Sequence, residues 1–224
     1  MEILFEDEHI LIINKPSNLL VHHSYYARNI VEDSLVELLI LQGIKAYPVH
    51  RLDRKTSGLI LFAKQKEKVP YFQRLFESRD IEKKYLALLR GHVQLNGVID
   101  SPVKNERGNY KDAETHFSCI RQIELQIPVE PYATSRYSIV EFSPKTGRMH
   151  QLRIHANKIS HPIIGDPKYG NRHHNHMFIE RFGVENLFLH AYSLEFTHPF
   201  TEEKCMFQVD VPSFWECINS TTNV

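Results

Sequence analysis

The sequence predicts an α+β protein, because it carries both strand-like and helix-like segments. The apolar runs at residues 10–13 and 59–63 have the length that buried strands use. Residues 135–142 alternate polar and apolar side chains, which is typical of a strand with one buried face. Residues 65–79 carry apolar side chains at helical spacing, which predicts an amphipathic helix.

The first 42 residues predict two strands, a loop and a helix. Residues 2–5 and 10–13 are apolar and flank a short acidic turn, as the two strands of a hairpin do. Residues 14–18 form the following loop. A helix is predicted over residues 33–42, where Asp33-Ser34 offers an N-cap.

The stretch from His50 to Phe62 joins a charged turn to a buried strand. Asp53 lies in this turn, and Gly58 suits a backbone that needs positive φ or a close approach. Arg51 and Arg54 flank the aspartate and favour its ionised form. The residues alone allow a nucleophile, an acid beside a phosphate, or a member of a structural ion pair in an ordinary turn.

The middle of the chain predicts a helix, a strand and a turn-rich segment. Pro70 lies near the start of the helix at residues 65–79, where proline is tolerated. Residues 81–91 predict a buried strand, and spacing alone favours a packing role for Tyr85 at its start. Residues 97–116 are rich in turn-forming side chains. Interrupted strands are then suggested by Phe117, Ile120, Ile123, Leu125 and Ile127.

The last third predicts a third helix, which follows the strand at residues 135–142. Thr146-Gly147 marks a strand-to-helix turn, and the apolar residues after it keep helical spacing. A helix N-terminus beside cations is a ready anion site, although a basic solvated face is the alternative. We interpret residues 171–176 as a flexible polar loop, despite three histidines that could bind zinc. Residues 187–198 predict strands.

Composition indicates a soluble globular protein. The chain has 224 residues, of which 42% are hydrophobic and 24% charged, both ordinary values. No stretch approaches the roughly 20 apolar residues of a membrane helix, and the N-terminus lacks signal-peptide features. The three cysteines are far apart and form no CxxC pair, so we expect reduced thiols and a cytoplasmic location.

The charge balance argues against indiscriminate binding to nucleic acid. Lysine and arginine number 27 and so do aspartate and glutamate, which gives a formal net charge of zero. Cations concentrate in residues 51–84 and 144–173. A neutral protein can still carry a basic surface, so the balance lowers the expectation of RNA binding without removing it.

Several motifs resemble those of the RluA family of pseudouridine synthases. HRLDRKTSGLILFAK at residues 50–64 resembles the family's active-site signature, which is long and specific. KPSNLLVH at residues 15–22 resembles its first motif, with Asn18 where the family usually has glycine. Asparagine tolerates left-handed backbone, so this departure is mild. KKYLALLRG at residues 83–91 and TGRMHQLRIH at residues 146–155 resemble the second and third motifs.

This resemblance implies roles for individual residues. Asp53 would be the catalytic nucleophile, and Arg153 would form an ion pair with it. Tyr85 would stack on the target base and assist proton transfer, which reverses the interpretation from spacing alone. The other residues that the resemblance assigns to the substrate site are Lys15, Arg51, Arg54, Arg148, His150 and Leu189. Among these, Arg51 would fill the position that the target base leaves in the RNA, and Leu189 would form an apolar wall.

The resemblance also implies an architecture. We expect residues 1–224 to form one pseudouridine synthase catalytic domain without the N-terminal S4-type domain of many family members. Its mostly antiparallel mixed sheet would be long and form two lobes, with flanking helices and a central active-site cleft. That cleft would bring Asp53, Tyr85 and Arg153 together. Residues 97–116 look like the segment that joins the lobes.

The implied function is the isomerisation of a uridine in RNA to pseudouridine, which requires no metal, nucleotide or other cofactor. The runs SHPIIGD and THPFT are most similar to the TruC-type branch, which modifies uridine 65 in the T-stem of tRNA. We therefore expect a monomer that acts on tRNA. The sequence leaves open whether Asp53 attacks C6 of the base or assists abstraction at C2′.

Three alternatives remain from the sequence. A ribosomal RNA pseudouridine synthase of the same family would carry the same motifs. A non-catalytic RNA-binding protein would not need the set of Asp53, Tyr85 and Arg153. A metal hydrolase would use His161, Asp166 and the histidines of His173–His176.

Overall fold

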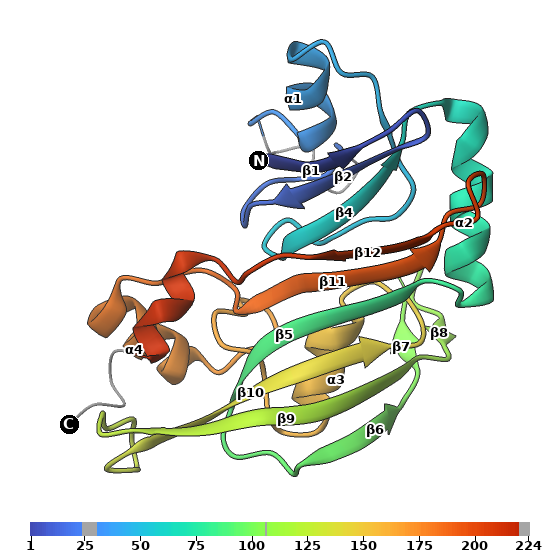
Figure 1. Cartoon of the computed structure of the whole chain (residues 1–224). Coiled ribbons are helices and arrows are strands. Elements are labelled where there is room, and N and C mark those ends of the chain that lie inside the picture. Colours follow the sequence, from blue (N-terminus) through green and yellow to red (C-terminus); the bar gives the residue numbers. More distant parts are fainter. Residues whose placement is uncertain (24–30, 106, 220–224) are drawn as a thin grey trace. The chain divides into compact units, whose positions relative to one another are not determined.

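The computed structural model describes residues 1–23, 31–105 and 107–219, which fall into two compact units (Figure 1). The first unit comprises Met1–Lys83 and Ala191–Asp210. The second comprises Lys84–His190 and the residues from Val211 onward. The chain therefore passes from one unit to the other three times.

The first unit is built on antiparallel strands. Strands β1 (Glu2–Glu6), β2 (Ile10–Lys15), β4 (Ser57–Ala63) and β11 (Leu189–Thr197, in this unit from Ala191) follow one another in the sheet. The pairs β1–β2 and β2–β4 are antiparallel, and Figure 1 shows these strands side by side. The short β3 (Tyr47–Pro48) pairs with β4, and β12 (Lys204–Gln208) pairs with β11.

The core of the first unit explains why β2 and β4 read as continuous apolar runs. All seven residues of β4 are buried, as are four of the first five of β2, because both strands are covered on both faces. Helix α2 (Val69–Ser78) follows a 3₁₀ turn, η2 (Lys66–Lys68), and buries Phe72 in this core. The core also includes Ile10, Ile12, Leu59, Leu61, Leu194 and Phe196.

The two predicted helices of this unit are confirmed. Helix α1 (Leu35–Leu41) begins at Ser34, whose side chain accepts from the backbone of Glu37 while Glu37 accepts from the backbone of Ser34. This reciprocal capping box satisfies amide groups that a helix start leaves unpaired. In α2, Pro70 lies in the first turn, where its missing N–H costs nothing.

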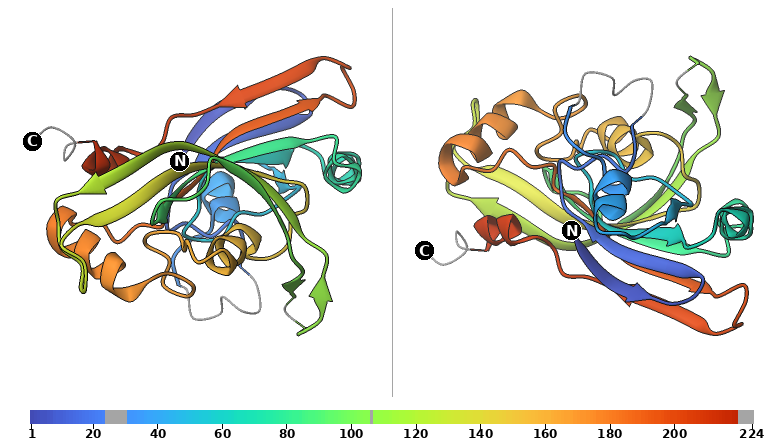
Figure 2. Two further views of the ribbon diagram at one scale, coloured as in Figure 1. Left: turned by 90° about the horizontal axis from the view of Figure 1, so that it is seen from below. Right: turned by 90° about the horizontal axis from the view of Figure 1, so that it is seen from above.

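The second unit is a four-stranded antiparallel sheet with helices. Its strand order is β5 (Glu82–Arg90), β10 (Ser135–Pro144), β9 (Glu114–Leu125) and β6 (Asn96–Asp100). Strands β7 (Val103–Lys104) and β8 (Tyr110–Lys111) form a separate small hairpin. Helices α3 (Gln151–Lys158) and α4 (Arg172–Phe182) lie on the same side of the strands (Figure 2). A last 3₁₀ helix, η3 (Ser213–Ile218), buries Trp215 and Ile218 in the hydrophobic core of this unit.

Two expectations from the sequence are wrong. Residues 171–176 are not a loop, because Asn171 caps α4 by accepting from the backbone amides of His173 and His174. The helix buries Met177 and Phe178 in the core. Residues 97–116 do not join the two units either, since they form β6, β7, β8 and the start of β9 inside the second unit.

Within the described ranges, no helix is both long enough and apolar enough to cross a membrane.

Candidate functional site

The loop that carries Asp53 lies in the first unit and leads directly into β4. Its turn is closed by the Thr56 amide, which donates to the Asp53 carbonyl at 3.1 Å. Leu52 and Thr56 are buried, whereas Arg51 is exposed and the Asp53 side chain is partly exposed. The loop is thus anchored through its apolar and backbone groups, while Asp53 stays partly exposed.

Lys15 at the end of β2 is buried beneath this loop. Its Nζ donates to the carbonyl oxygens of Pro16 and Leu19, both at 2.9 Å, and of Arg54 at 3.1 Å. An ammonium group has three N–H donors and no acceptor, so three carbonyls match its charged form. Burial lowers the pKa of Lys15 to about 7, and the charge of Asp53 acts to raise it. The resemblance assigned Lys15 to the substrate site, but its described partners are the protein's own backbone.

Two further contacts tie the first motif to the signature loop. The Ser17 hydroxyl donates to the Lys55 carbonyl at 2.7 Å, and Arg54 Nε donates to the Asn18 carbonyl at 3.1 Å. Asn18 has a φ of 65°, so asparagine indeed occupies left-handed backbone where the family usually has glycine. Residues 15–18 and 53–56 are therefore held together as one structural group.

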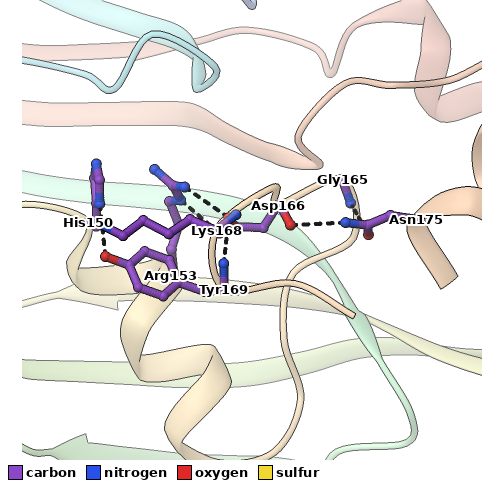
Figure 3. A network of polar contacts seen from close by, with 7 residues as sticks. All are labelled: His150, Arg153, Gly165, Asp166, Lys168, Tyr169 and Asn175. Atoms are coloured by element: carbon purple, nitrogen blue, oxygen red, sulfur yellow. Dashed lines mark hydrogen bonds and ion pairs between the residues drawn. The ribbon is translucent and has the colours of Figure 1, made fainter. Parts of the chain in front are cut away.

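The second unit contains a buried ion pair at α3 (Figure 3). Arg153 Nε and Nη2 donate to Asp166 Oδ2 and Oδ1 at 2.7 and 2.8 Å, and the two side chains are 8% and 1% exposed. The backbone amides of Lys168 and Tyr169 also donate to Oδ1. Burial acts to raise the pKa of Asp166, but these hydrogen bonds and the charge of Arg153 hold it below its usual range.

The turn around Asp166 is fixed by neighbouring side chains. The guanidinium carbon of Arg153 lies 5.2 Å from the centre of the Tyr169 ring, and the Tyr169 hydroxyl is 3.1 Å from His150 Nδ1 (Figure 3). From α4, Asn175 accepts from the Gly165 amide at 2.8 Å and donates to the Asp166 carbonyl at 2.9 Å. Sequence reasoning missed Tyr169 and Asn175, although the run SHPIIGD ends at Asp166 in this segment.

The predicted turn at Thr146-Gly147 is organised by Gln151, the first residue of α3. Its side-chain oxygen accepts from the Thr146 hydroxyl at 2.7 Å and from the Arg148 amide at 3.0 Å. Its side-chain nitrogen donates to the Glu114 carbonyl at 3.0 Å. Arg148 itself is exposed, and its Nε donates to the Asp112 carbonyl at 3.1 Å.

The remaining predicted site residues of the second unit lie on strands. Tyr85 is half-buried on β5, opposite Phe142 of β10. Leu189 is 3% exposed at the start of β11. Both positions are set by well-paired backbone or core packing, which suits side chains that must keep a fixed orientation.

The predicted site residues are divided between the two units. Lys15, Arg51, Asp53 and Arg54 belong to the first unit. The second unit holds Tyr85, Arg148, His150, Arg153 and Leu189. Within that unit the carboxylate paired with Arg153 is Asp166, and the expected pairing of Arg153 with Asp53 stays a prediction.

The residues considered for a metal site have other partners. His161 Nδ1 lies 2.8 Å from the Arg90 carbonyl, and His174 Nδ1 lies 2.8 Å from the Tyr137 hydroxyl. His176 lies 3.0 Å from Glu180 one turn along α4. Asp166 pairs with Arg153. Across residues 1–23, 31–105 and 107–219, no three metal-binding side chains gather into a site.

Comparison with known proteins agrees with these motifs. The family described as RNA pseudouridylate synthase matches residues 9–158. Two proteins named tRNA pseudouridine synthase C, from Haemophilus ducreyi and Pasteurella multocida, are both 37% identical to this chain. The alignments cover 97% and 96% of this chain, and 94% and 93% of the relatives.

Solved structures show the same fold. Human RNA pseudouridylate synthase domain containing 1 superposes with a TM-score of 0.72 at 26% identity, covering 94% of this chain and 83% of that one. Human RNA pseudouridylate synthase domain containing 4 superposes with a TM-score of 0.68 at 25% identity, covering 95% of this chain and 89% of that one. The predicted α+β pseudouridine synthase fold is therefore confirmed. On this similarity of sequence and fold, the chain belongs to the RNA pseudouridylate synthase family.

Proposed function

We propose that this protein converts a uridine of tRNA to pseudouridine. The observation that carries the proposal is the similarity, over almost the whole chain, to relatives named tRNA pseudouridine synthase C. Within tRNA, the resemblance to the TruC-type branch points to uridine 65 of the T-stem. We propose that the enzyme acts in the cytoplasm as a single catalytic domain and as a monomer.

The reaction breaks the N1–C1′ bond of uridine, turns the base, and joins C5 to C1′. C5 loses a proton to solvent once the new bond has formed, and N1 gains one, so the product is an isomer of uridine and no electrons are gained or lost. We propose Asp53 as the nucleophile, because its loop is anchored at Thr56 and Lys15 while the residue is partly exposed. Arg51, which is exposed two residues earlier, would occupy the space that the flipped base leaves in the RNA.

Tyr85 and Arg153 complete the proposed catalytic set. The Tyr85 ring would hold the flipped uracil by stacking, which typically contributes about 1–3 kcal/mol per base. A guanidinium has five N–H donors, and Asp166 accepts from the Nε–Nη2 edge of Arg153. We propose that Arg153 also orients the Asp53 carboxylate. Asp166, Tyr169 and Lys15 would then act as positioning residues that hold the catalytic side chains.

The first test is tritium release from RNA labelled at C5 of uridine. The native protein and the Asp53→Asn variant receive a tRNA transcript, a matched transcript with a C65–G49 pair, and ribosomal RNA. We expect release from the first transcript alone, and none with Asp53→Asn. Release from both tRNA transcripts would overturn the assignment of uridine 65 as the target. Release from ribosomal RNA instead would overturn tRNA as the substrate, and RNA binding without any release would favour the non-catalytic binder.

A further inference from the structure

The loop that carries Asp53 begins where β3 and β4 separate. These strands pair at Tyr47↔Ala63 and Pro48↔Phe62, and the Val49 amide then donates to the Leu61 carbonyl at 3.3 Å. The Leu61 amide points toward the same side, but it donates to Nε2 of the His50 side chain at 3.0 Å. A side chain therefore satisfies a buried strand amide at the point where the backbone ladder ends.

The imidazole of His50 is partly buried and contacts other groups of the first unit. It packs against the Phe76 ring, with 4.7 Å between ring centres, and makes a hydrogen bond with the Arg51 backbone. The Lys83 ammonium lies 5.3 Å from the centre of the Phe76 ring. The ring thus bridges Leu61 on β4 and Arg51, which is two residues before Asp53.

The hydrogen bond from Leu61 requires an unprotonated Nε2. A nitrogen that accepts from an amide cannot carry its own proton, so the imidazole must be neutral. Burial lowers the pKa of His50 to about 3, and the charge of Lys83 acts in the same direction. The hydrogen bond with the Arg51 backbone acts to raise it. The neutral ring is therefore the stable form at neutral pH.

We propose that His50 is a positioning residue for Asp53. The neutral imidazole of His50 fixes the start of the catalytic loop by accepting a hydrogen bond from the Leu61 amide. This inference rests on the proposed function of Asp53. The far side of the loop is already held, because Lys15 bonds the Arg54 carbonyl and Ser17 bonds the Lys55 carbonyl. His50 holds the loop on the N-terminal side of Asp53, as Lys15 and Ser17 hold it on the C-terminal side.

The test compares His50→Gln with His50→Leu. Both substitutions remove the ring from Phe76, but glutamine can place an oxygen near the position of Nε2, whereas leucine offers no acceptor. We expect His50→Leu to lower kcat about 10- to 100-fold, the scale that small misplacements of a catalytic group produce. KM for tRNA should change by less than about twofold, because the loop would lose orientation rather than RNA contacts. His50→Gln should recover most of kcat.

Amide exchange at Leu61 gives a readout that does not depend on catalysis. We expect protection of this amide in the native protein and in His50→Gln, and faster exchange in His50→Leu. Equal kcat in folded Gln and Leu variants, whether lowered or unchanged, would overturn the proposal. If the leucine variant does not fold, a folded His50→Gln variant with near-native kcat supports the proposal, and one with a loss above about tenfold overturns it.

His198 supplies the control in the same unit. Its buried Nδ1 accepts from the amides of Phe200 and Thr201, in the turn between β11 and β12. His198→Leu should lower thermal stability and leave kcat unchanged, and an equal loss of kcat would overturn the special role of His50. If the native protein releases no tritium from any RNA, the proposed function fails, while Leu61 exchange still tests whether His50 holds the loop.

Discussion

At the scale of single residues, the buried guanidinium of Arg153 depends on the Asp166 carboxylate. Their side chains are 8% and 1% exposed, so neither charge is well solvated. Breaking a buried pair from one side leaves a charge without compensation, which costs far more than loss of a surface pair. The pair is therefore a sensitive point for both stability and the orientation of Arg153.

We predict that Asp166→Asn destabilises the protein by about 3–5 kcal/mol in urea unfolding at pH 7. Asparagine keeps the size of the side chain but not its charge. Lys204→Ala serves as the control, because the Lys204–Glu195 pair is solvent-exposed and should contribute little. Similar small effects of both substitutions would contradict a dominant role for the buried pair.

The pH dependence of the same variant has a definite sign. The pKa of Asp166 is lower in the folded protein than in the unfolded chain. Its contribution to stability is therefore fully present above the unfolded pKa of about 4 and is lost as pH falls through the folded pKa. The Asp166→Asn variant should lack this part of the acid-side decline. An unchanged slope below about pH 4 would contradict the assignment.

At the scale of elements, Gly58 allows β4 to pass close to β11. Its φ is +109°, and a Cβ there would lie 2.2 Å from the carbonyl oxygen of Ala191. This clash cannot be relieved by a side-chain movement, because the backbone fixes the position of the Cβ and the atoms that it would meet belong to the Ala191 backbone. The signature TSGL therefore needs glycine for a packing reason as well as for its conformation.

Gly58→Ala should cost about 3 kcal/mol or more, because backbone strain and overpacking add. Gly43→Ala provides the matched control, since Gly43 also has positive φ, at +77°, but nothing lies within 4 Å of its added Cβ. That substitution should cost about 1–2 kcal/mol from conformation alone. Urea unfolding of the two variants measures the difference. Equal costs would show that the close approach to Ala191 is tolerated.

The strands β2 and β4 and the helices α1 and α2 were predictable because local patterns determine them. The apolar runs became β2 and β4, and Ser34 and Pro70 took the helix positions that their chemistry favours. The strand β9 was predicted as interrupted because Ile120 falls at a register shift in its pairing with β10 and is 57% exposed. A bulge of this kind breaks the apolar alternation without ending the strand.

Helix α4 was missed because its start is polar and rich in histidine. Its apolar contacts come from later residues, and His174 enters the core only because Tyr137 supplies a hydrogen-bond partner from β10. The Arg153–Asp166 pair was missed for a similar reason. The sequence pattern offered Asp166 as a metal ligand, and only the fold of the turn after α3 brings it onto Arg153. Partners of this kind depend on tertiary structure.

At the scale of the whole molecule, a net charge of zero must be reconciled with an RNA substrate. With 27 cationic and 27 acidic side chains, the overall charge provides no net attraction. Affinity for RNA must then come from local groups of cations, each acting within about 10 Å at moderate salt. The substrate-facing cations that the family resemblance predicts are consequently few and individually measurable.

We predict that Arg148→Gln weakens tRNA binding and reduces the slope of log K against log salt concentration by about one, as expected for a lost phosphate contact. Arg148 is exposed at the turn before α3, where Gln151 fixes its backbone. Arg136→Gln is the control, because Arg136 is an exposed arginine on β10 whose Nε lies 3.6 Å from Glu124. Titrations with the Asp53→Asn background avoid turnover during the measurement. A salt slope that falls equally in both variants would mean that long-range charge drives binding. A slope that falls only in Arg148→Gln means that a neutral protein binds RNA through a few fixed contacts.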